Sequence, residues 1–169
     1  MLRNLDNDAA HPEAAGPGHW NDPDYLGPEL GMTSTEAQSQ LSMWAILAAP
    51  LILGSDPRAL SSATISMLTN AQVIAVDQDA LGAQGRLIQQ TGSGQVWVKP
   101  LATGAGAVAL FNRGTSALQI TTTAGAAGLP RASGYGLQNL WANTTTTTKG
   151  TITALVPAHG VVLYRVTPR

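Results

Sequence analysis

The sequence contains no cysteine, and this absence removes several kinds of chemistry at once. It excludes a disulfide framework, a catalytic thiol nucleophile and a zinc site with cysteine ligands. It does not by itself fix the cellular compartment. Any catalytic or binding site must therefore be built from carboxylates, histidines, hydroxyls, amides and aromatic rings.

Carboxylates are missing from the second half of the chain. All ten Asp and Glu residues lie between Asp6 and Asp79, where only two arginines oppose them, so residues 1–79 carry a formal charge of −8. Residues 80–169 hold seven Lys and Arg and no acid, which gives a formal charge of +7. The asymmetry indicates two modules. It also excludes paired-carboxylate catalysis from the second module, which has no side-chain carboxylate.

Charge is scarce overall, and long apolar runs are absent. Charged residues make up 11% of the chain, whereas an average soluble domain has about 25%. The seven cations after residue 80 are scattered singly, which argues against a nucleic-acid partner. The longest apolar run, Met43–Gly54, is far shorter than the roughly 20 residues that span a membrane, so we expect no membrane partner.

The first 80 residues carry helical patterns separated by short extended segments. Helices are expected over residues 1–10, 33–49, 55–69 and 70–76. The second of these helices begins with the capping-box pattern Thr33–Glu36. Residues 19–21 and 51–54 predict two short strands, the latter wholly apolar as in a covered parallel sheet. Two strands alone bury too little, so this part looks like the end of a larger α/β domain.

After Gly82 the pattern changes to short alternating segments between Gly-rich and Thr-rich turns. Seven strands are predicted: Arg86–Gln90, Gln95–Pro100, Ala107–Asn112, Ala117–Thr122, Leu137–Ala142, Thr151–Val156 and Val161–Val166. Strands of this length and spacing are typical of an antiparallel β-sandwich. The run Thr144–Thr148 predicts only a β-rich or loop segment without chemistry. We expect a multidomain α/β plus all-β chain, divided into residues 1–82 and 83–169.

The strongest local cluster of candidate functional residues is Gly18-His19-Trp20-Asn21-Asp22-Pro23-Asp24-Tyr25. Carboxylates at the end of a barrel strand can accept hydrogen bonds from sugar hydroxyls, and Trp or Tyr can stack on a sugar ring. The same spacing fits an Asx-Pro turn that only shapes a loop, and spacing alone favours that interpretation.

The remaining titratable groups give weaker signals. Asp77 and Asp79 form a second close pair, but their position favours a structural junction in which Asp79 caps locally. His19 and His159 have no partner at metal-binding spacing. We therefore expect neither a metal nor a cofactor.

Two longer motifs make the sequence specific. Gly18–Asp24 (GHWNDPD), followed by Met43–Leu51 (MWAILAAPL), resembles the family 27 glycoside hydrolases, which are α-galactosidases and α-N-acetylgalactosaminidases. Asn70–Asp79 and Leu81–Gly85 match the same family. Val156–Tyr164 resembles the end of the C-terminal sandwich in its secreted actinobacterial members. The resemblance covers essentially the whole chain.

The resemblance implies a retaining hydrolase in which a (β/α)8 TIM barrel precedes an antiparallel β-sandwich. Residues 1–82 would supply the last two β/α units, with residues 19–21 and 51–54 as strands 7 and 8. The family places its nucleophile on strand 4 and its acid/base on strand 6, and neither segment is found here. We therefore predict that both catalytic aspartates lie upstream of Met1 and that the chain is a fragment, inactive alone.

The resemblance also assigns binding roles. It implies that Asp24 lines the galactose pocket and that Tyr25, where the family commonly has Met, packs against the sugar. Asp22 and Trp20 complete the predicted substrate-binding set. The substrate would be a terminal α-D-galactoside, and the parent enzyme would be extracellular, with its signal peptide in the missing N-terminal part. The change from Met to Tyr leaves a β-L-arabinopyranosidase preference open.

Two other classes of function compete with this one. The sandwich could be a non-catalytic carbohydrate-binding module in which Trp97, Tyr135 and Trp141 stack on sugar. Core packing of these rings is favoured, because Trp97 lies mid-strand between valines. Alternatively, the sandwich only braces the barrel, an arrangement compatible with the opposite formal charges of the two modules. The sequence leaves the oligomeric state open.

Overall fold

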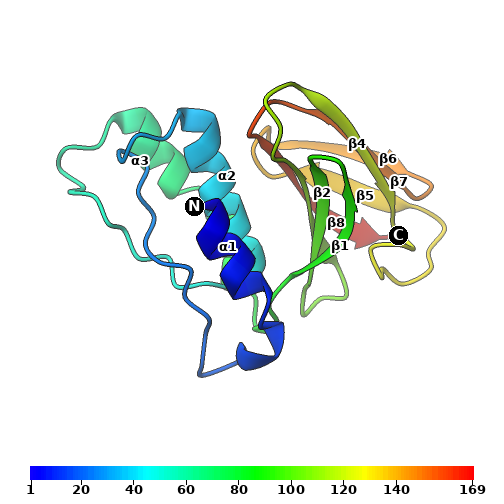
Figure 1. Ribbon diagram of the computed structural model, residues 1–169. Coiled ribbons are helices and arrows are strands. Elements are labelled where there is room, and N and C mark those ends of the chain that lie inside the picture. Colours follow the sequence, from blue (N-terminus) through cyan, green and yellow to red (C-terminus); the bar gives the residue numbers. More distant parts are fainter.

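The computed structural model describes residues 1–169, and it divides them into a helical part and a β part (Figure 1). The helical part consists of four α-helices and one 3-10 helix: α1 Leu2–Ala9, η1 Pro12–Ala14, α2 Ser34–Leu47, α3 Ser62–Leu68 and α4 Ala71–Asp77. Long loops connect these helices and lie on the side away from the sheets. No helix in the structure is both long enough and apolar enough to cross a membrane.

Helix α2 is the centre of the helical part. The Thr33 hydroxyl accepts a hydrogen bond from the Glu36 backbone N–H, and the Glu36 carboxylate accepts one from the Thr33 N–H, which confirms the capping box. The helix ends where Ala48 adopts a left-handed conformation, with φ of 55°. From Ala37 onward nearly every residue is buried, so α2 contacts protein on all sides.

The two predicted barrel strands are only partly realised. Residues 51–54 lie where strand 8 was predicted, but the parallel contact is a single bridge between Leu26 and Leu53. Two backbone hydrogen bonds of 2.8 Å support it, from Leu26 N–H to Ile52 O and from Gly54 N–H to Leu26 O. The prediction of a strand at residues 19–21 was wrong. Residues 19–21 and 51–54 have no neighbouring strands with which to form a ladder of backbone hydrogen bonds, so neither segment becomes a regular strand.

The third predicted helix, residues 55–69, was too long. The observed helix, α3, begins at Ser62, because Ser61 caps it through a hydrogen bond accepted from the Thr64 N–H. Upstream, the Asp56 carboxylate accepts hydrogen bonds from the backbone and guanidinium of Arg58 and so forms a turn. Local side-chain bonds of this kind compete with helix, which explains the late start.

The β part contains eight strands, one more than predicted: β1 Arg86–Thr91, β2 Gly94–Pro100, β3 Gly106–Asn112, β4 Leu118–Thr123, β5 Tyr135–Asn139, β6 Thr144–Thr148, β7 Thr151–Val156 and β8 Val161–Pro168. Six form one antiparallel sheet in the order β1-β2-β3-β8-β5-β6, and β4 pairs with β7 in a second sheet. The threonine run is strand β6 at the sheet edge. Strand β5 ends at Asn139 rather than residue 142, because the Asn139 carboxamide accepts hydrogen bonds from the Trp141 and Ala142 N–H groups.

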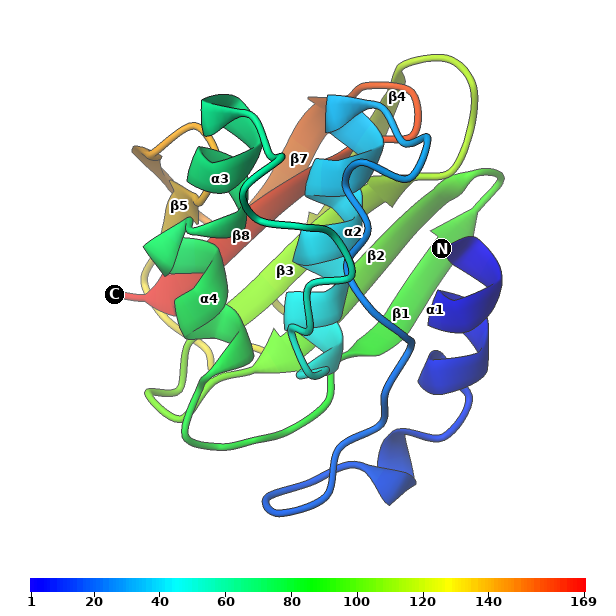
Figure 2. The same ribbon diagram turned by 90° about the vertical axis from the view of Figure 1, so that its left-hand side faces the viewer.

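The large sheet has a hydrophobic core on each face. One face packs against the two-stranded sheet through residues such as Val108, Leu110 and Ile152. The other face packs against the helices, with α2 lying across β2, β3 and β8 (Figure 2). This second core, called the seam core here, joins residues of both parts: Leu5, Leu41, Met43, Trp44, Ile46, Leu47, Val73, Val76, Trp97, Ala107, Ala109, Phe111, Leu140, Val161 and Leu163. The helical part and the β part therefore share an apolar interior instead of meeting at a polar surface.

Polar contacts add specificity to the seam. Arg113 donates two hydrogen bonds of 2.9 Å to the Asp6 carboxylate on α1, a bidentate ion pair. Trp141 donates its indole N–H to the Ser42 hydroxyl at 2.9 Å, and the Ser39 hydroxyl donates to His159 O at 2.8 Å. Both serines belong to α2, so this helix is fixed to the sandwich by hydrogen bonds as well as by apolar packing.

Candidate functional site

The Asp22–Tyr25 segment forms a tight turn that uses both of its carboxylates. One oxygen of Asp22 accepts a hydrogen bond from the Asp24 N–H at 2.9 Å, and one oxygen of Asp24 accepts from the Tyr25 N–H at 2.8 Å. The Asx-Pro turn is thus present. Both side chains remain exposed, so their other oxygens stay available to a ligand.

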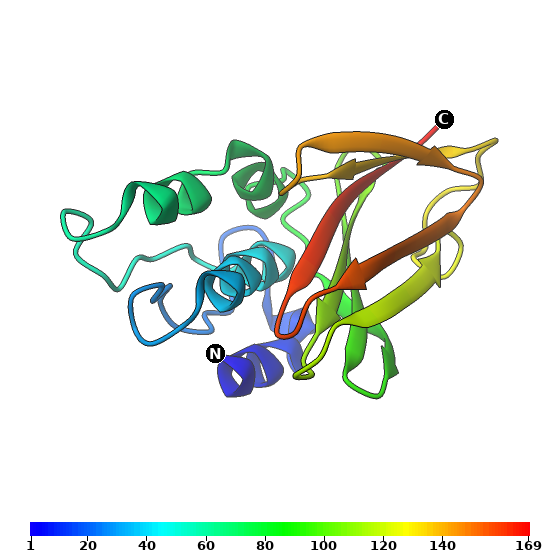
Figure 3. The same ribbon diagram turned by 90° about the horizontal axis from the view of Figure 1, so that it is seen from above.

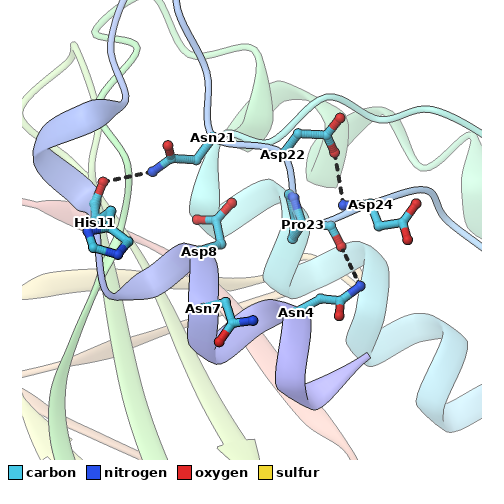
Figure 4. Close-up of a pocket in the computed structure, with 8 residues that line it drawn as sticks. All are labelled: Asn4, Asn7, Asp8, His11, Asn21, Asp22, Pro23 and Asp24. Carbon is cyan, nitrogen blue, oxygen red and sulfur yellow. Dashed lines mark hydrogen bonds between the residues drawn. The ribbon is translucent and has the colours of Figure 1, made fainter.

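The turn borders a surface hollow of about 300 Å³ between α1 and the loop that follows it (Figure 4). The hollow is entirely polar apart from one proline, and its lining residues are Asn4, Asn7, Asp8, His11, Asn21, Asp22, Pro23 and Asp24. Amide and carboxylate side chains of this kind offer many hydrogen-bond donors and acceptors at close range. The arrangement suits a small, hydroxyl-rich ligand better than an apolar one.

Asp8 is the most perturbed group of the hollow. Its residue is 8% exposed, and burial raises the pKa of its carboxyl to about 6, with the neighbouring Asp22 charge acting in the same direction. The Gln84 side-chain amide donates to one Asp8 oxygen at 2.9 Å and opposes this shift, while the second oxygen has no partner. An unpaired buried carboxyl oxygen is costly, and a ligand donor in the hollow would relieve that cost.

Tyr25 and Trp20 face other surroundings. The Tyr25 ring lies directly against Gly54, where a Cβ would meet it at 2.2 Å, and it borders a separate hollow with Asp24 and Gln40. Trp20 lies against Gly82 and lines a third hollow with Asp77 and Asp79. Both rings are nearly half exposed. The structure therefore brings together Asp22, Asp24 and Tyr25, and it separates Trp20 from them.

Several residues of the hollow were outside the predicted substrate-binding set. Asn4, Asn7 and Asp8 lie on α1, and Asn21 donates its side-chain amide to His11 O at 2.7 Å and to Gln84 Oε1 at 3.0 Å. A signal for Asp8 was present, because it lies three residues after Leu5 on the apolar face of α1. An acid on the buried side of an amphipathic helix indicates a special environment.

The aromatic residues of the sandwich serve its structure. Trp97 is 1% exposed within the seam core and donates its indole N–H to the Gln95 side chain at 3.0 Å. Tyr135 is buried between the sheets, with its hydroxyl donating to Pro130 O at 2.9 Å. Trp141 packs against the seam core and bonds Ser42. Trp97 and Tyr135 are buried, so neither presents an open ring face of the kind that sugar stacking requires.

The acidic pair Asp77 and Asp79, at the end of α4, forms a junction with the sandwich. One Asp79 oxygen accepts hydrogen bonds from the Leu81 N–H at 3.1 Å and the Ala102 N–H at 2.8 Å. Burial raises the pKa of Asp77 to about 6. Burial also lowers the pKa of Lys99, whose ammonium donates to Ala83 O at 2.6 Å, although the Asp77 and Asp79 charges act against that shift. These groups hold the linker between the two parts, as the predicted junction requires.

No group of three or more His, Cys, Asp or Glu side chains lies close enough to hold a metal ion. His19 forms a small bridge with Gly16, and His159 lies in a turn with φ of 54°. Neither histidine meets a carboxylate in an ion pair.

Comparison with known proteins connects this geometry to a family. Residues 4–79 match the family model described as "Alpha galactosidase A", and residues 91–166 match the "Alpha galactosidase C-terminal beta sandwich domain". An α-galactosidase of Coffea arabica is 46% identical over 82% of this chain and 37% of its own length. The crystal structure of α-galactosidase I from Mortierella vinacea superposes with a TM-score of 0.90 and 32% identity, over all of this chain and 46% of that one.

The matches run through both parts of the chain. The chain is therefore related to the glycoside hydrolases of family 27, and it corresponds to the C-terminal portion of an α-galactosidase, the end of the barrel followed by the β-sandwich. It spans about 37–46% of the length of these relatives. The coffee and Mortierella relatives are eukaryotic and give no support to the actinobacterial type that the last sequence motif suggested.

Proposed function

We propose, on the premise that this chain is the C-terminal portion of a family 27 α-galactosidase, that its Asp22–Tyr25 turn forms part of the wall of a galactoside pocket. The observation that carries this proposal is the turn itself: two exposed carboxylates, each with one oxygen committed to the backbone and one free. Because the direction of the free carboxylate oxygen is already fixed, it can accept a hydrogen bond from a sugar hydroxyl without the further entropy cost of ordering the side chain. Asp24 has the principal role, and Asp22 sets its orientation.

Hydrolysis requires groups that this chain does not supply. Retention of configuration uses two carboxyls roughly 5–5.5 Å apart, one as nucleophile and one as acid/base. Asp22 and Asp24 are engaged in a turn, and the family resemblance assigns the two catalytic aspartates to barrel strands 4 and 6, which this chain does not include. We therefore propose that the parent enzyme releases terminal α-D-galactose with retention, and that residues 1–169 alone bind but do not hydrolyse. The parent enzyme acts outside the cell in this proposal.

Tyr25 bears on sugar specificity. A structure of a family 27 β-L-arabinopyranosidase from Geobacillus stearothermophilus shares the fold of this chain with a TM-score of 0.88 at 23% identity. Galactopyranose and arabinopyranose differ by one hydroxymethyl group, so a bulkier side chain at the pocket wall can favour the smaller sugar. Raffinose was bound in a yeast α-galactosidase structure, and for this chain we propose an α-galactoside as the substrate. L-Arabinose is the comparison ligand.

A calorimetric titration of residues 1–169 with galactose tests the proposal. Binding is expected for the unaltered chain, weakened about tenfold in Asp24→Asn because a charge-assisted hydrogen bond is lost. Asp56→Asn is the matched control, since Asp56 is an exposed acid engaged with Arg58 and not with the hollow. Unchanged binding in Asp24→Asn would refute the role of Asp24. Binding abolished only by changes in the sandwich would favour a carbohydrate-binding module instead.

A rate assay with p-nitrophenyl-α-galactoside tests the division of labour. We expect no turnover by purified residues 1–169. Turnover that disappears in Asp24→Ala would contradict the proposal that the catalytic carboxyls lie outside this chain.

A further inference from the structure

Asp24 is held in a conformation that an aspartate seldom adopts. Its φ is 79°, in the left-handed region that favours glycine, and it is one of four non-glycine residues with positive φ in the chain. Such a backbone persists only where surrounding contacts over-determine it. The question is which contacts hold this residue in place.

The two local hydrogen bonds hold only the N–H side of the turn. They join Asp24 N–H to Asp22 and Tyr25 N–H to Asp24 itself, and both are exposed to solvent. Exposed bonds of this kind exchange readily with water and add little net stability. The carbonyl side of the turn is held by different groups.

Helix α2 supplies those groups from two buried side chains. Trp44, which is fully buried, donates its indole N–H to Asp24 O at 2.7 Å. Gln40 uses both ends of its amide: it donates to Tyr25 O at 3.2 Å and accepts from the Gly27 N–H at 3.1 Å. Three hydrogen bonds from two side chains thus fix the backbone from Asp24 to Gly27.

The spacing on α2 explains how one helix contacts both the turn and the sandwich. Gln40 and Trp44 are four residues apart and share one face. Ser39 and Ser42, which bond His159 O and Trp141, point to other sides of the helix. Figures 1 and 2 show α2 between the loop layer on one side and the large sheet on the other. Figure 3 shows the same order from above.

We propose that Trp44 and Gln40 are positioning residues for galactoside binding, because they hold Asp24 in its left-handed conformation and so aim its carboxylate into the pocket. This inference rests on the proposed function for the galactoside itself. It also gives the sandwich a role without catalytic groups: it fixes the helix that carries these two residues. Both residues act through the backbone of the turn.

The test compares two buried tryptophans of the seam core. Trp44→Phe keeps an aromatic ring and removes the donor to Asp24 O, together with part of the buried volume of the indole. Trp97→Phe removes an indole donor from the same core, but its partner is Gln95 within β2, away from the turn. Gln40→Leu removes the bonds to Tyr25 and Gly27. Each variant is prepared in the 169-residue chain and followed by NMR.

The readouts are the strong amide–Hα contact within residue 24, which marks a positive φ, and the exchange rates of the amides of residues 24, 25 and 27. In Trp44→Phe and Gln40→Leu we expect weakening of that contact and exchange about two- to tenfold faster, as loss of a hydrogen bond implies. Trp97→Phe should leave the turn unchanged. Adding Asp24→Gly to Trp44→Phe should restore the positive φ, because glycine needs no support there.

These outcomes separate the inference from the proposed function. If the unaltered chain does not bind galactose, the pocket proposal fails, while the NMR readouts still decide whether the two residues hold the turn. If the unaltered chain binds galactose, Trp44→Phe should weaken galactose binding about two- to tenfold while the secondary structure stays unchanged. The inference is overturned if Trp44→Phe keeps the amide–Hα contact within residue 24 and the amide exchange rates of the unaltered chain. If Trp97→Phe loses galactose affinity equally, the effect of Trp44 comes from general core packing.

Discussion

The buried carboxyl of Asp8 makes the stability of this chain depend on pH in a direction that can be worked out. The substitution to examine is Asp8→Asn, which keeps an oxygen to accept from Gln84 and removes the titrating group. The folded pKa of Asp8 is about 6, against 3.8 for the unperturbed group. The folded state therefore binds the proton more tightly than the unfolded state does.

The sign and size follow from linkage. Because the folded pKa is raised, Asp8 lowers the free energy of unfolding as pH rises from about 4 through 6. A difference of about two units corresponds to roughly 3 kcal/mol at pH 7, at 1.36 kcal/mol per unit. At pH 4 nearly all of this penalty is gone. The stability of Asp8→Asn relative to the unaltered chain should thus fall by about 2 kcal/mol or more between pH 7 and pH 4.

Urea unfolding at pH 4, 5, 6 and 7 measures this difference directly. The comparison removes the contributions of other titrating groups, Asp77 included, because both chains carry them. Asp6→Asn is a useful contrast to Asp8→Asn, because it also replaces an acid of α1 but acts by breaking the ion pair with Arg113. The reasoning is refuted if the difference in unfolding free energy between Asp8→Asn and the unaltered chain stays constant with pH to within about 0.5 kcal/mol. Burial of Asp8 and its unpaired oxygen would then not raise the pKa as described.

Three further predictions concern the seam core and the turn. Leu163→Ala should lower the free energy of unfolding by about 2–5 kcal/mol, because Leu163 is fully buried in the shared core, and circular dichroism should show helices and strands unfolding together. Leu155 is 66% exposed, so Leu155→Ala should change stability little. Separate unfolding transitions for helices and strands would contradict a shared core. Trp141→Phe should cost about 1 kcal/mol in urea unfolding, and it should cost less in a Ser42→Ala background, where the hydroxyl that accepts from the indole is already gone; an equal cost in both backgrounds would contradict that bond. Asp24→Gly should raise the melting temperature through a gain of about 1 kcal/mol from relieved strain, and a lower melting temperature would show that the positive φ is not strained.

Much of the fold followed from local signals in the sequence. The capping box and the apolar run of α2 both act within a few residues, and the predicted helix and its start are confirmed. The alternating segments predicted most strands for the same reason. Thr144–Thr148 was predicted only as a β-rich or loop segment, and pairing with β5 makes it strand β6. The strand expected at residues 19–21 failed because pairing partners, not local pattern, decide whether an extended segment becomes a strand.

The candidate site was predictable where its residues are consecutive. Asp22, Asp24 and Tyr25 lie together because a single turn contains them. Trp20 was expected beside them, but packing against Gly82 takes its ring to another hollow. Asp8 comes from an earlier helix, and Gln40 and Trp44 from a later one, so only the tertiary fold brings them to the turn. The seam core is likewise a product of packing between two differently patterned parts.

The most direct test of the central claim, that the Asp22–Tyr25 turn contacts a galactose ring, is a galactose titration of the isotope-labelled chain followed by NMR, with glucose as the comparison sugar. Saturating changes in the amide signals of Asp24 and Tyr25 are predicted with galactose and not with glucose. Changes confined to the sandwich strands, or equal responses to both sugars, would contradict the claim.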